Sequence, residues 1–286
     1  MFMIANILLP IDFSERSTDA ADAAAAIAER FDSKITLLHV LAPRFEVPVG
    51  PSAQRSVVHA FAREEAEEKM REFRCKEWRH LEVERVLREG EPASTISEYA
   101  ESENIDLIMM PTHGYGPFRR LLLGSVTAKV LHDTKCPVWT AVHCQEKGQI
   151  SAQPRRIATA VDLGPHTSVV LTWASQLSWE FGAPLSIIHV TPLDTWVDED
   201  YIWPEWREDV IGTARAKLRE LLQTEGINAE IHIEVGSIPD AVVKWTRGVG
   251  ADLLIMGRGD HGGGTGRLPT NAYAIIRDAS CPVLAV

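Results

Sequence analysis

The chain has no hydrophobic run long enough to cross a membrane as a helix. Such a helix needs about 20 consecutive apolar residues, and no apolar run of this 286-residue sequence approaches that length. The first residues also lack the pattern of a secretory leader, which is a basic region followed by an apolar stretch and a cleavage site. We therefore expect no membrane partner and a cytoplasmic location.

Cysteine is scarce, and its spacing excludes the common metal motifs. The cysteines are Cys75, Cys136, Cys144 and Cys281, and no two of them have the close spacing of a metal site. Cys136 and Cys281 each stand directly before a proline, at equivalent positions in the two halves of the chain. We expect reduced cysteines that serve packing, and no metal site.

Positive charge is also in short supply, because 29 Lys and Arg residues face 40 Asp and Glu residues, for a formal net charge of −11. Proteins that bind nucleic acid draw much of their binding free energy from Lys and Arg side chains that neutralise phosphates. The composition therefore predicts no nucleic-acid partner, and any nucleotide site has to be local.

What the sequence does contain is an internal repeat. The segment 7–12 (ILLPID) is answered by 157–162 (IATAVD), and 35–40 (ITLLHV) by 185–190 (LSIIHV). Further along, 105–110 corresponds to 251–256, and Cys-Pro-Val occurs at 136–138 and 281–283. We predict one domain over 1–144 and a second over 155–286. Polar residues 145–154, with Gly148 and Pro154, form the expected linker.

Short runs of Val, Ile and Leu alternate with longer amphipathic stretches in both halves, which is typical of an α/β fold around a parallel sheet. The predicted strands are 4–11, 35–41, 82–88, 105–110 and 137–142, then 156–161, 185–190, 229–235, 252–256 and 283–286. The predicted helices are 17–31, 57–78, 93–103 and 125–133, then 166–181, 205–225, 238–248 and 270–278.

A glycine-containing loop joins the fourth strand of the first half to the next helix. It reads Met110-Pro-Thr-His-Gly114, then nine residues, then Gly124-Ser125. Glycine allows backbone N–H groups to approach an anion, and the unpaired N–H groups at a helix start favour negative charge. The loop therefore predicts a phosphate site.

These residues resemble the ATP-binding loop of the universal stress protein family, whose pattern is Gly, two residues, Gly, nine residues, Gly, then Ser or Thr. Pro111 replaces the first glycine and, having no N–H, removes one backbone donor. With the repeat, the resemblance covers nearly the whole chain. It implies two tandem Rossmann-like domains, each an open parallel sheet of strand order 3-2-1-4-5.

In such a sheet, ligands bind beyond the carboxyl ends of the strands where the strand order reverses. Asp12 ends the first strand there, and it accepts hydrogen bonds from a ribose hydroxyl or base amine, caps the helix that follows, or does both. The resemblance implies that the domain binds ATP, with Mg²⁺. The predicted binding residues are Pro10, Ile11, Asp12, Val40, Met110, Pro111, His113, Gly114, Gly124, Ser125 and Val126.

Several of these residues also have a simpler interpretation. By the resemblance, Val40 would offer its backbone to the adenine edge, but it is equally a strand residue of the core. Ser125 could direct its hydroxyl to a phosphate or serve as a helix N-cap. His113 could contact phosphate or lie in solvent. His39 and His189 recur at equivalent strand ends, which favours a packing role.

The second half departs further from the family pattern. Gly257 stands at the first glycine of the motif, but Asp260 replaces the second, and Pro269-Thr270 replace Gly124-Ser125. An aspartate beside a triphosphate adds repulsion, and Pro269 removes another donor. We expect the first half to bind ATP, and the site around Asp162 and Gly257 to bind it weakly or not at all.

Three functions remain open at this point. The first is an ATP-binding stress or signalling module that responds to its nucleotide. The second is a slow ATP hydrolase, although no Asp or Glu lies between Met110 and Ser125, so no catalytic residue is assigned and at most weak turnover is expected. The third is a nucleotide-independent dimeric scaffold. The last strands resemble the family strand that pairs across a twofold axis, so we expect a homodimer.

Overall fold

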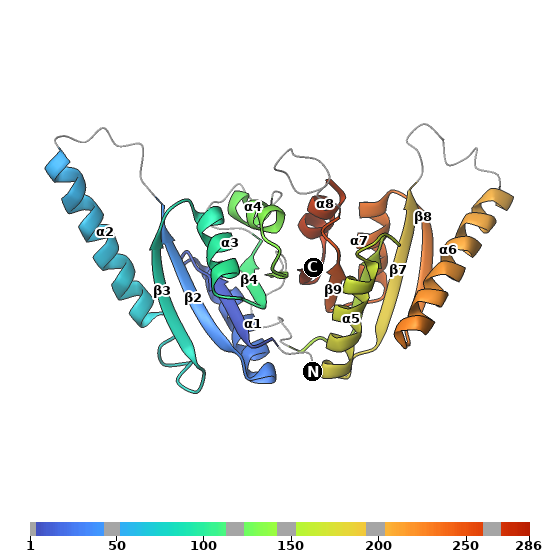
Figure 1. Ribbon diagram of the computed structural model, residues 1–286, viewed down its shortest axis with the longest axis horizontal. Coiled ribbons are helices and arrows are strands. Elements are labelled where there is room, and N and C mark those ends of the chain that lie inside the picture. Colours follow the sequence, from blue (N-terminus) through green and yellow to red (C-terminus); the bar gives the residue numbers. More distant parts are fainter. Residues whose placement is uncertain (1–3, 43–51, 113–122, 142–152, 193–203, 260–269) are drawn as a thin grey trace. The chain divides into compact units, whose positions relative to one another are not determined.

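The computed structural model describes residues 4–42, 52–112, 123–141, 153–192, 204–259 and 270–286 (Figure 1). The chain divides into two compact units, Met1–Ala141 and Val142–Val286. Most of the predicted linker, 145–152, lies outside the described residues. Within the described parts, no helix is long and apolar enough to cross a membrane.

The first unit alternates strands and helices in the predicted order. Its elements are β1 (Asn6–Pro10), α1 (Glu15–Phe31), β2 (Lys34–Leu41), α2 (Ser52–Glu72), β3 (Val83–Glu89), α3 (Pro92–Ser102), β4 (Leu107–Pro111), α4 (Ser125–Asp133) and β5 (Val138–Ala141). Its strands are parallel and lie in the order β3-β2-β1-β4-β5. The predicted α/β fold and strand order are confirmed.

The second unit repeats this arrangement. Its elements are β6 (Ile157–Val161), α5 (Thr167–Phe181), β7 (Leu185–Pro192), α6 (Pro204–Glu225), β8 (Glu230–Gly236), α7 (Ile238–Gly248), β9 (Leu253–Met256), α8 (Thr270–Asp278) and β10 (Val283–Ala285). Its strands are again parallel, in the order β8-β7-β6-β9-β10. Helices α3 and α4 contact each other in the first unit, as α7 and α8 do in the second (Figure 1).

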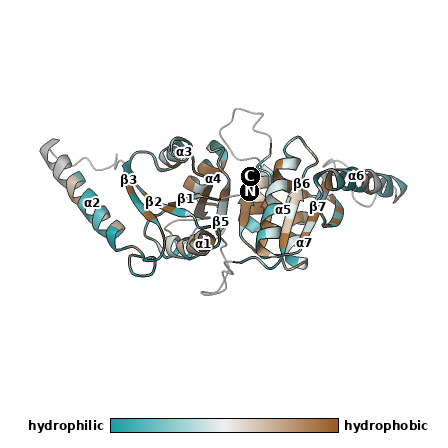
Figure 2. Cartoon of the chain, turned by 60° about the horizontal axis from the view of Figure 1, so that its bottom comes forward, coloured by the Kyte–Doolittle hydropathy of each residue, from teal (hydrophilic) through white to brown (hydrophobic). Residues whose placement is uncertain are grey.

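The central strands form the core of each unit. In β1, Ile7, Leu8 and Leu9 are fully buried on both faces, as expected for a parallel sheet covered by helices. Figure 2 shows the hydrophobic residues gathered on these strands, whereas α6 is largely hydrophilic. Helix α1 turns a stripe of small buried residues, including Ala20, Ala24 and Ala28, toward the sheet.

The start of α1 is fixed by local chemistry. Ser14 is its N-cap, and the Ser14 side chain accepts a hydrogen bond from the Ser17 backbone N–H at 3.2 Å. The helix ends at Phe31, and its C-cap Asp32 adopts a left-handed conformation with φ of 54°. A capped start directly after β1 holds the β1–α1 turn in place, and that turn borders the site described below.

Two expectations are wrong in this region. Helix α2 ends at Glu72 rather than at 78, because Arg74 takes a left-handed φ of 52° and the chain turns so that Trp78 is buried. Cys75 lies in this turn and is exposed, so it has no packing role.

Cys281 is buried as expected, and that burial raises the pKa of its thiol to about 12. Cys144 lies outside the described residues.

Candidate functional site

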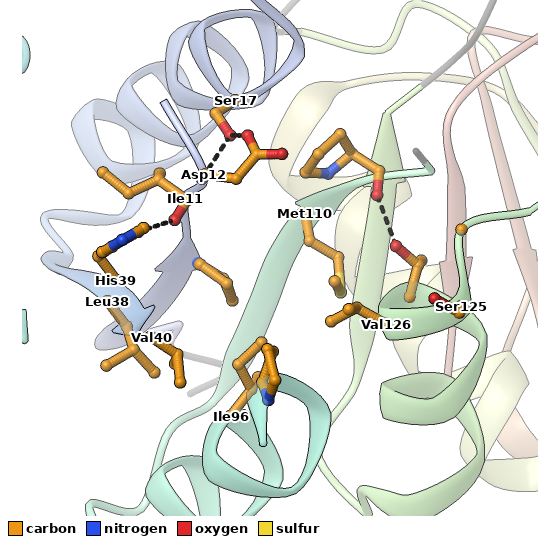
Figure 3. Close-up of a pocket in the computed structure, with 15 residues that line it drawn as sticks. Ile11, Asp12, Ser17, Leu38, His39, Val40, Ile96, Met110, Ser125 and Val126 are labelled. Atoms are coloured by element: carbon orange, nitrogen blue, oxygen red, sulfur yellow. Dashed lines mark hydrogen bonds between the residues drawn. The ribbon is translucent and has the colours of Figure 1, made fainter. Parts of the chain in front are cut away.

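A pocket of about 320 Å³ lies at the carboxyl ends of β1, β2 and β4 in the first unit, between the starts of α3 and α4 (Figure 3). All the predicted site residues line it except His113 and Gly114, which lie outside the described residues. The lining consists of Pro10, Ile11, Asp12, Ser17, Leu38, His39, Val40, Pro92, Ile96, Met110, Pro111, Gly124, Ser125, Val126 and Thr127.

Asp12 takes part in both the fold and the pocket wall. Its Oδ1 accepts hydrogen bonds from the Ser14 N–H at 3.0 Å and from the Ser17 hydroxyl at 2.6 Å. Ser17 in turn accepts from the Asp12 N–H at 3.0 Å. The second carboxylate oxygen, Oδ2, points into the pocket (Figure 3). Ser14 is the N-cap of α1, so Asp12 supports the capped turn and presents one oxygen to a ligand.

The neighbouring His39 is held by the backbone of β1. Its Nδ1 lies 2.7 Å from the Ile11 carbonyl oxygen, and because a carbonyl only accepts, Nδ1 carries the hydrogen. Burial lowers the pKa of His39, against the opposing effects of this hydrogen bond and of Asp12. The ring also packs on Phe13, with centroids 4.5 Å apart. His39 is therefore a neutral wall of the pocket near pH 7.

The start of α4 faces the opposite side of the pocket. Gly124 is its N-cap, with φ of −58° and ψ of 141° and no side-chain cap. The Gly124 carbonyl accepts the Ala128 N–H at 2.8 Å, so the first-turn N–H groups of Ser125, Val126 and Thr127 have no acceptor within the helix. Ser125 is the first helical residue and Gly124 is the N-cap, so of the two interpretations of Ser125 the N-cap is wrong and the phosphate contact stays a prediction.

Pro111 connects β4 to α4. It is the last residue of β4, and its carbonyl oxygen accepts a hydrogen bond from the buried Thr127 hydroxyl at 2.9 Å. The following Thr112 carbonyl accepts the Gly124 N–H at 2.8 Å. Proline thus fits at the strand end, and the loss of its N–H leaves the start of α4 in place.

Sequence reasoning missed part of the lining. Pro92 and Ile96 come from α3, and Ser17 and Thr127 lie in the first turns of α1 and α4. The α3 residues carry no motif, and only the crossing of the chain over the sheet brings them to the pocket. For Ser17 a signal existed, because a hydroxyl five residues after a strand-ending aspartate recurs as Thr167 after Asp162.

The second unit has a pocket of about 190 Å³ in the corresponding place. Asp162 and Gly257 line it, whereas Asp260 and Pro269 lie outside the described residues. The Asp162 Oδ1 accepts from the Gly164 N–H at 2.8 Å and from the Thr167 hydroxyl at 3.2 Å. His189 Nδ1 lies 2.9 Å from the Val161 carbonyl oxygen, which corresponds to the contact of His39 Nδ1 with the Ile11 carbonyl oxygen in the first unit. The frame around the two aspartates is therefore shared.

Metal ligands do not gather near either pocket in the part of the chain that the structure describes. There, no group of three or more His, Cys, Asp or Glu side chains is placed to hold a metal ion. His39 and His189 instead bond to backbone carbonyls of their own units.

Comparison with known proteins gives one consistent result. A sequence model of the universal stress protein family matches residues 3–141 and 154–286. A universal stress protein of Mycolicibacterium smegmatis is 27% identical over 98% of this chain and 96% of its own length. Universal stress protein MJ0531 of Methanocaldococcus jannaschii is 32% identical over 46% of this chain and 79% of its own length.

Among solved structures, a universal stress protein from Archaeoglobus fulgidus has a TM-score of 0.70 to this chain. It is 25% identical, and the match covers 99% of this chain and 96% of that one. The family match falls separately on each of the two units, and the repeated strand order agrees with it. The chain therefore belongs to the universal stress protein family, with two tandem copies of the family domain.

Proposed function

We propose that the first unit binds ATP in the pocket beyond β1, β2 and β4, and that the protein is a nucleotide-responsive stress or signalling module. The observation that carries this proposal is the pairing of the Asp12 carboxylate on one wall with the start of α4 on the other. Family membership and the likeness of the Gly114 and Gly124-Ser125 loop to the family ATP-binding loop support it.

The pocket offers a different surface to each part of the nucleotide. Ile11, Val40 and Ile96 provide an apolar surface for the adenine ring (Figure 3). Asp12 Oδ2 is a strong acceptor for a ribose hydroxyl. The first-turn N–H groups of α4 and its positive dipole end face the phosphates. Mg²⁺ would stay with the phosphates and water, as it does when few carboxylates are at hand.

The lining favours binding over turnover. Asp12 is the carboxylate among the described lining residues, and its Oδ1 is already held by Ser14 and Ser17. Activation of a water for attack on a phosphate requires a positioned base or water-orienting group near the phosphates. Asp12 lies across the pocket from the start of α4, and His39 is held beside Ile11.

As a nucleotide-responsive module, the protein works in the cytoplasm, as a homodimer.

Calorimetric titration of nucleotide-free protein with Mg-ATP tests the proposal. We expect about one ATP per chain, and a loss of at least tenfold in affinity in Gly124→Asp, which adds a negative charge where the phosphates would lie. Gly124 has ordinary backbone angles, and aspartate is a favoured N-cap, so this variant should fold.

The matched control is Gly226→Asp. It adds the same charge outside the pocket, where a Cβ meets nothing within 4 Å, and the left-handed φ of 67° strains aspartate less than most residues. It should bind ATP as the unchanged protein does. Absence of ATP binding in the unchanged protein would overturn the proposal in favour of a scaffold, and parallel titrations with ADP, AMP and cAMP would show which nucleotide is preferred.

A further inference from the structure

We propose that a groove of the second unit, which lies between α6, β7 and the turn after β6, binds a small methylated ammonium ion of the choline class. The groove has a volume of about 480 Å³, and we call it the α6 groove. Among the described residues, Asp162 lines both this groove and the pocket around Gly257, and the other lining residues of the two differ. The α6 groove is therefore a separate place on the second unit.

The α6 side of the groove is a single stripe of the helix. It consists of Trp206, Asp209, Thr213 and Lys217, which are spaced three or four residues apart. Residues at this spacing share one face of a helix. All four side chains are exposed, so a ligand held there keeps part of its contact with water.

The opposite side of the groove is where the two units differ. Leu163 and His189 line it, and they correspond in the repeat to Phe13 and His39 of the first unit. In the first unit Phe13 packs on His39, with centroids 4.5 Å apart, and on Phe73 at 6.2 Å. Replacement of this phenylalanine by a leucine leaves more room beside the histidine in the second unit.

Trp206 and Asp209 make one end of the groove attractive to a cation. Trp206 is 46% exposed. Within the described residues, the Trp206 and Asp209 side chains take part in no hydrogen bond, ion pair or ring contact. An indole ring attracts a cation over its face, and a carboxylate one turn further along the helix lies close enough to balance the charge.

The positive side chains nearby are directed elsewhere. Lys217 donates to the Leu163 carbonyl at 3.1 Å. It stands three turns after Trp206, about 16 Å along the helix axis, and exposed charges more than about 10 Å apart are largely screened. The Arg207 guanidinium lies 3.4 Å from the Glu234 carboxylate. The net charge of −11 also favours the approach of a cation.

The remaining lining favours a methylated ammonium over a metal ion. Val210 offers methyl groups an apolar contact, and the Thr213 hydroxyl, one turn after Asp209, can bond the hydroxyl of a choline. Quaternary ammonium groups are also well suited to an aromatic face. A divalent ion would require several carboxylates. No group of three or more ligating side chains occurs in the part of the chain that the structure describes.

Choline and its neutral carbon isostere dimethylbutanol, in which a carbon atom replaces the charged nitrogen, test the proposal on the unchanged protein. We expect choline to bind saturably, with one molecule per chain by calorimetry, and the isostere to bind about tenfold more weakly or worse. Ethanolamine, which has the charge without the methyl groups, should also bind more weakly. Choline binding does not depend on the proposed ATP site, so Gly124→Asp should leave it unchanged.

Two variants locate the site. Trp206→Leu removes the ring, and Asp209→Asn removes the charge while keeping the shape. Each should weaken choline binding about fivefold. Both side chains are exposed, so both variants should fold, which urea unfolding checks.

Each variant has a matched control. Trp179→Leu removes a tryptophan of α5 that is 79% exposed and lies outside the groove lining. Glu208→Gln removes the exposed carboxylate next to Asp209, which does not line the groove. Neither should change choline binding. The proposal would be overturned by the absence of saturable choline binding, by equal binding of choline and either of the other two probes, or by equal losses in a variant and its control.

Discussion

Asp12 directs its two carboxylate oxygens to different tasks. Oδ1 accepts from Ser14 and Ser17 and holds the β1–α1 turn, whereas Oδ2 points into the pocket. The sequence predicts ligand binding, helix capping or both for this residue. In the structure Ser14 is the N-cap of α1, and Asp12 supports the turn that contains Ser14. A local sequence pattern cannot separate the two oxygens of one side chain.

Asp12→Asn separates these tasks. Asparagine keeps an acceptor oxygen for Ser14 and Ser17, so the free energy of unfolding should change little. The oxygen that faces the ligand becomes an NH₂ group, which cannot accept from a hydroxyl, so the dissociation constant for ATP should rise about tenfold, or about 1.4 kcal/mol. Calorimetry and urea unfolding measure the two effects.

Asp162→Asn is the matched control, because Asp162 holds the corresponding turn of the second unit. It should leave ATP affinity unchanged. An equal loss of affinity in both variants would show that the two pockets do not differ in nucleotide binding.

At the scale of elements, Glu91 joins two helices beside the pocket. It is the N-cap of α3, its carboxylate accepts from the backbone N–H groups of Ala93 and Ser94, and Lys129 of α4 donates to it at 2.9 Å. Partial burial raises the pKa of Glu91, but the hydrogen bonds from Ser94, Lys129 and Ala93 outweigh it and lower the pKa to about 2.

This shift predicts a pH dependence of stability. The folded-state pKa of Glu91 is about 2, below its ordinary 4.5, so its contribution is fully present above pH 4.5 and is lost as the pH falls from 4.5 toward 2. The difference in unfolding free energy between the unchanged protein and Glu91→Gln should therefore narrow over that range. Urea unfolding at a series of pH values measures it. Glu98→Gln, at an exposed position of α3, should lower the free energy of unfolding by less than Glu91→Gln does. If the difference between the unchanged protein and Glu91→Gln stayed constant between pH 4.5 and 2, the lowered pKa of Glu91 would be contradicted.

Two glycines have opposite roles in their elements. Gly212 lies inside α6, where a Cβ meets nothing within 4 Å, so Gly212→Ala should stabilise the protein by about 0.5–1 kcal/mol. Gly90 has φ of 155°, and a Cβ there would lie 2.5 Å from Thr95 Oγ1. Gly90→Ala should cost roughly 1–3 kcal/mol through strain and crowding. Urea unfolding of both variants checks this, and shifts of the same sign would contradict it.

Strands could be predicted at this scale because each is marked by a short hydrophobic run, and the repeat because the same runs recur in the second half. Runs such as Ile7 to Leu9 are buried on both faces, so hydrophobicity alone marks them. The end of α2 could not be predicted, since no Gly or Pro marks the left-handed turn at Arg74. The place of Pro92 and Ile96 in the pocket depends on how α3 crosses the sheet, and no property of the two residues themselves carries that information.

At the scale of the whole molecule, each unit serves as the internal reference for the other. Mg-ATP should slow hydrogen exchange at the starts of α1 and α4, around Asp12–Ser17 and Ser125–Thr127, and leave the Asp162–Thr167 turn unchanged. The reason is that ligand binding suppresses local opening of the segments it contacts. Exchange followed by mass spectrometry on the intact chain measures both at once. Equal protection of the two turns would contradict a single ATP site.

The two pockets keep the same turn around Asp12 and Asp162, whereas other lining residues differ, with Thr127 in the first pocket and Ala272 in the second. Because both belong to one polypeptide, every molecule that is synthesised carries one pocket of each type. Their ratio stays at one to one at any level of expression, which two separately encoded subunits could match only through matched synthesis and turnover. A change in the abundance of this protein therefore alters the capacity of both sites in equal proportion.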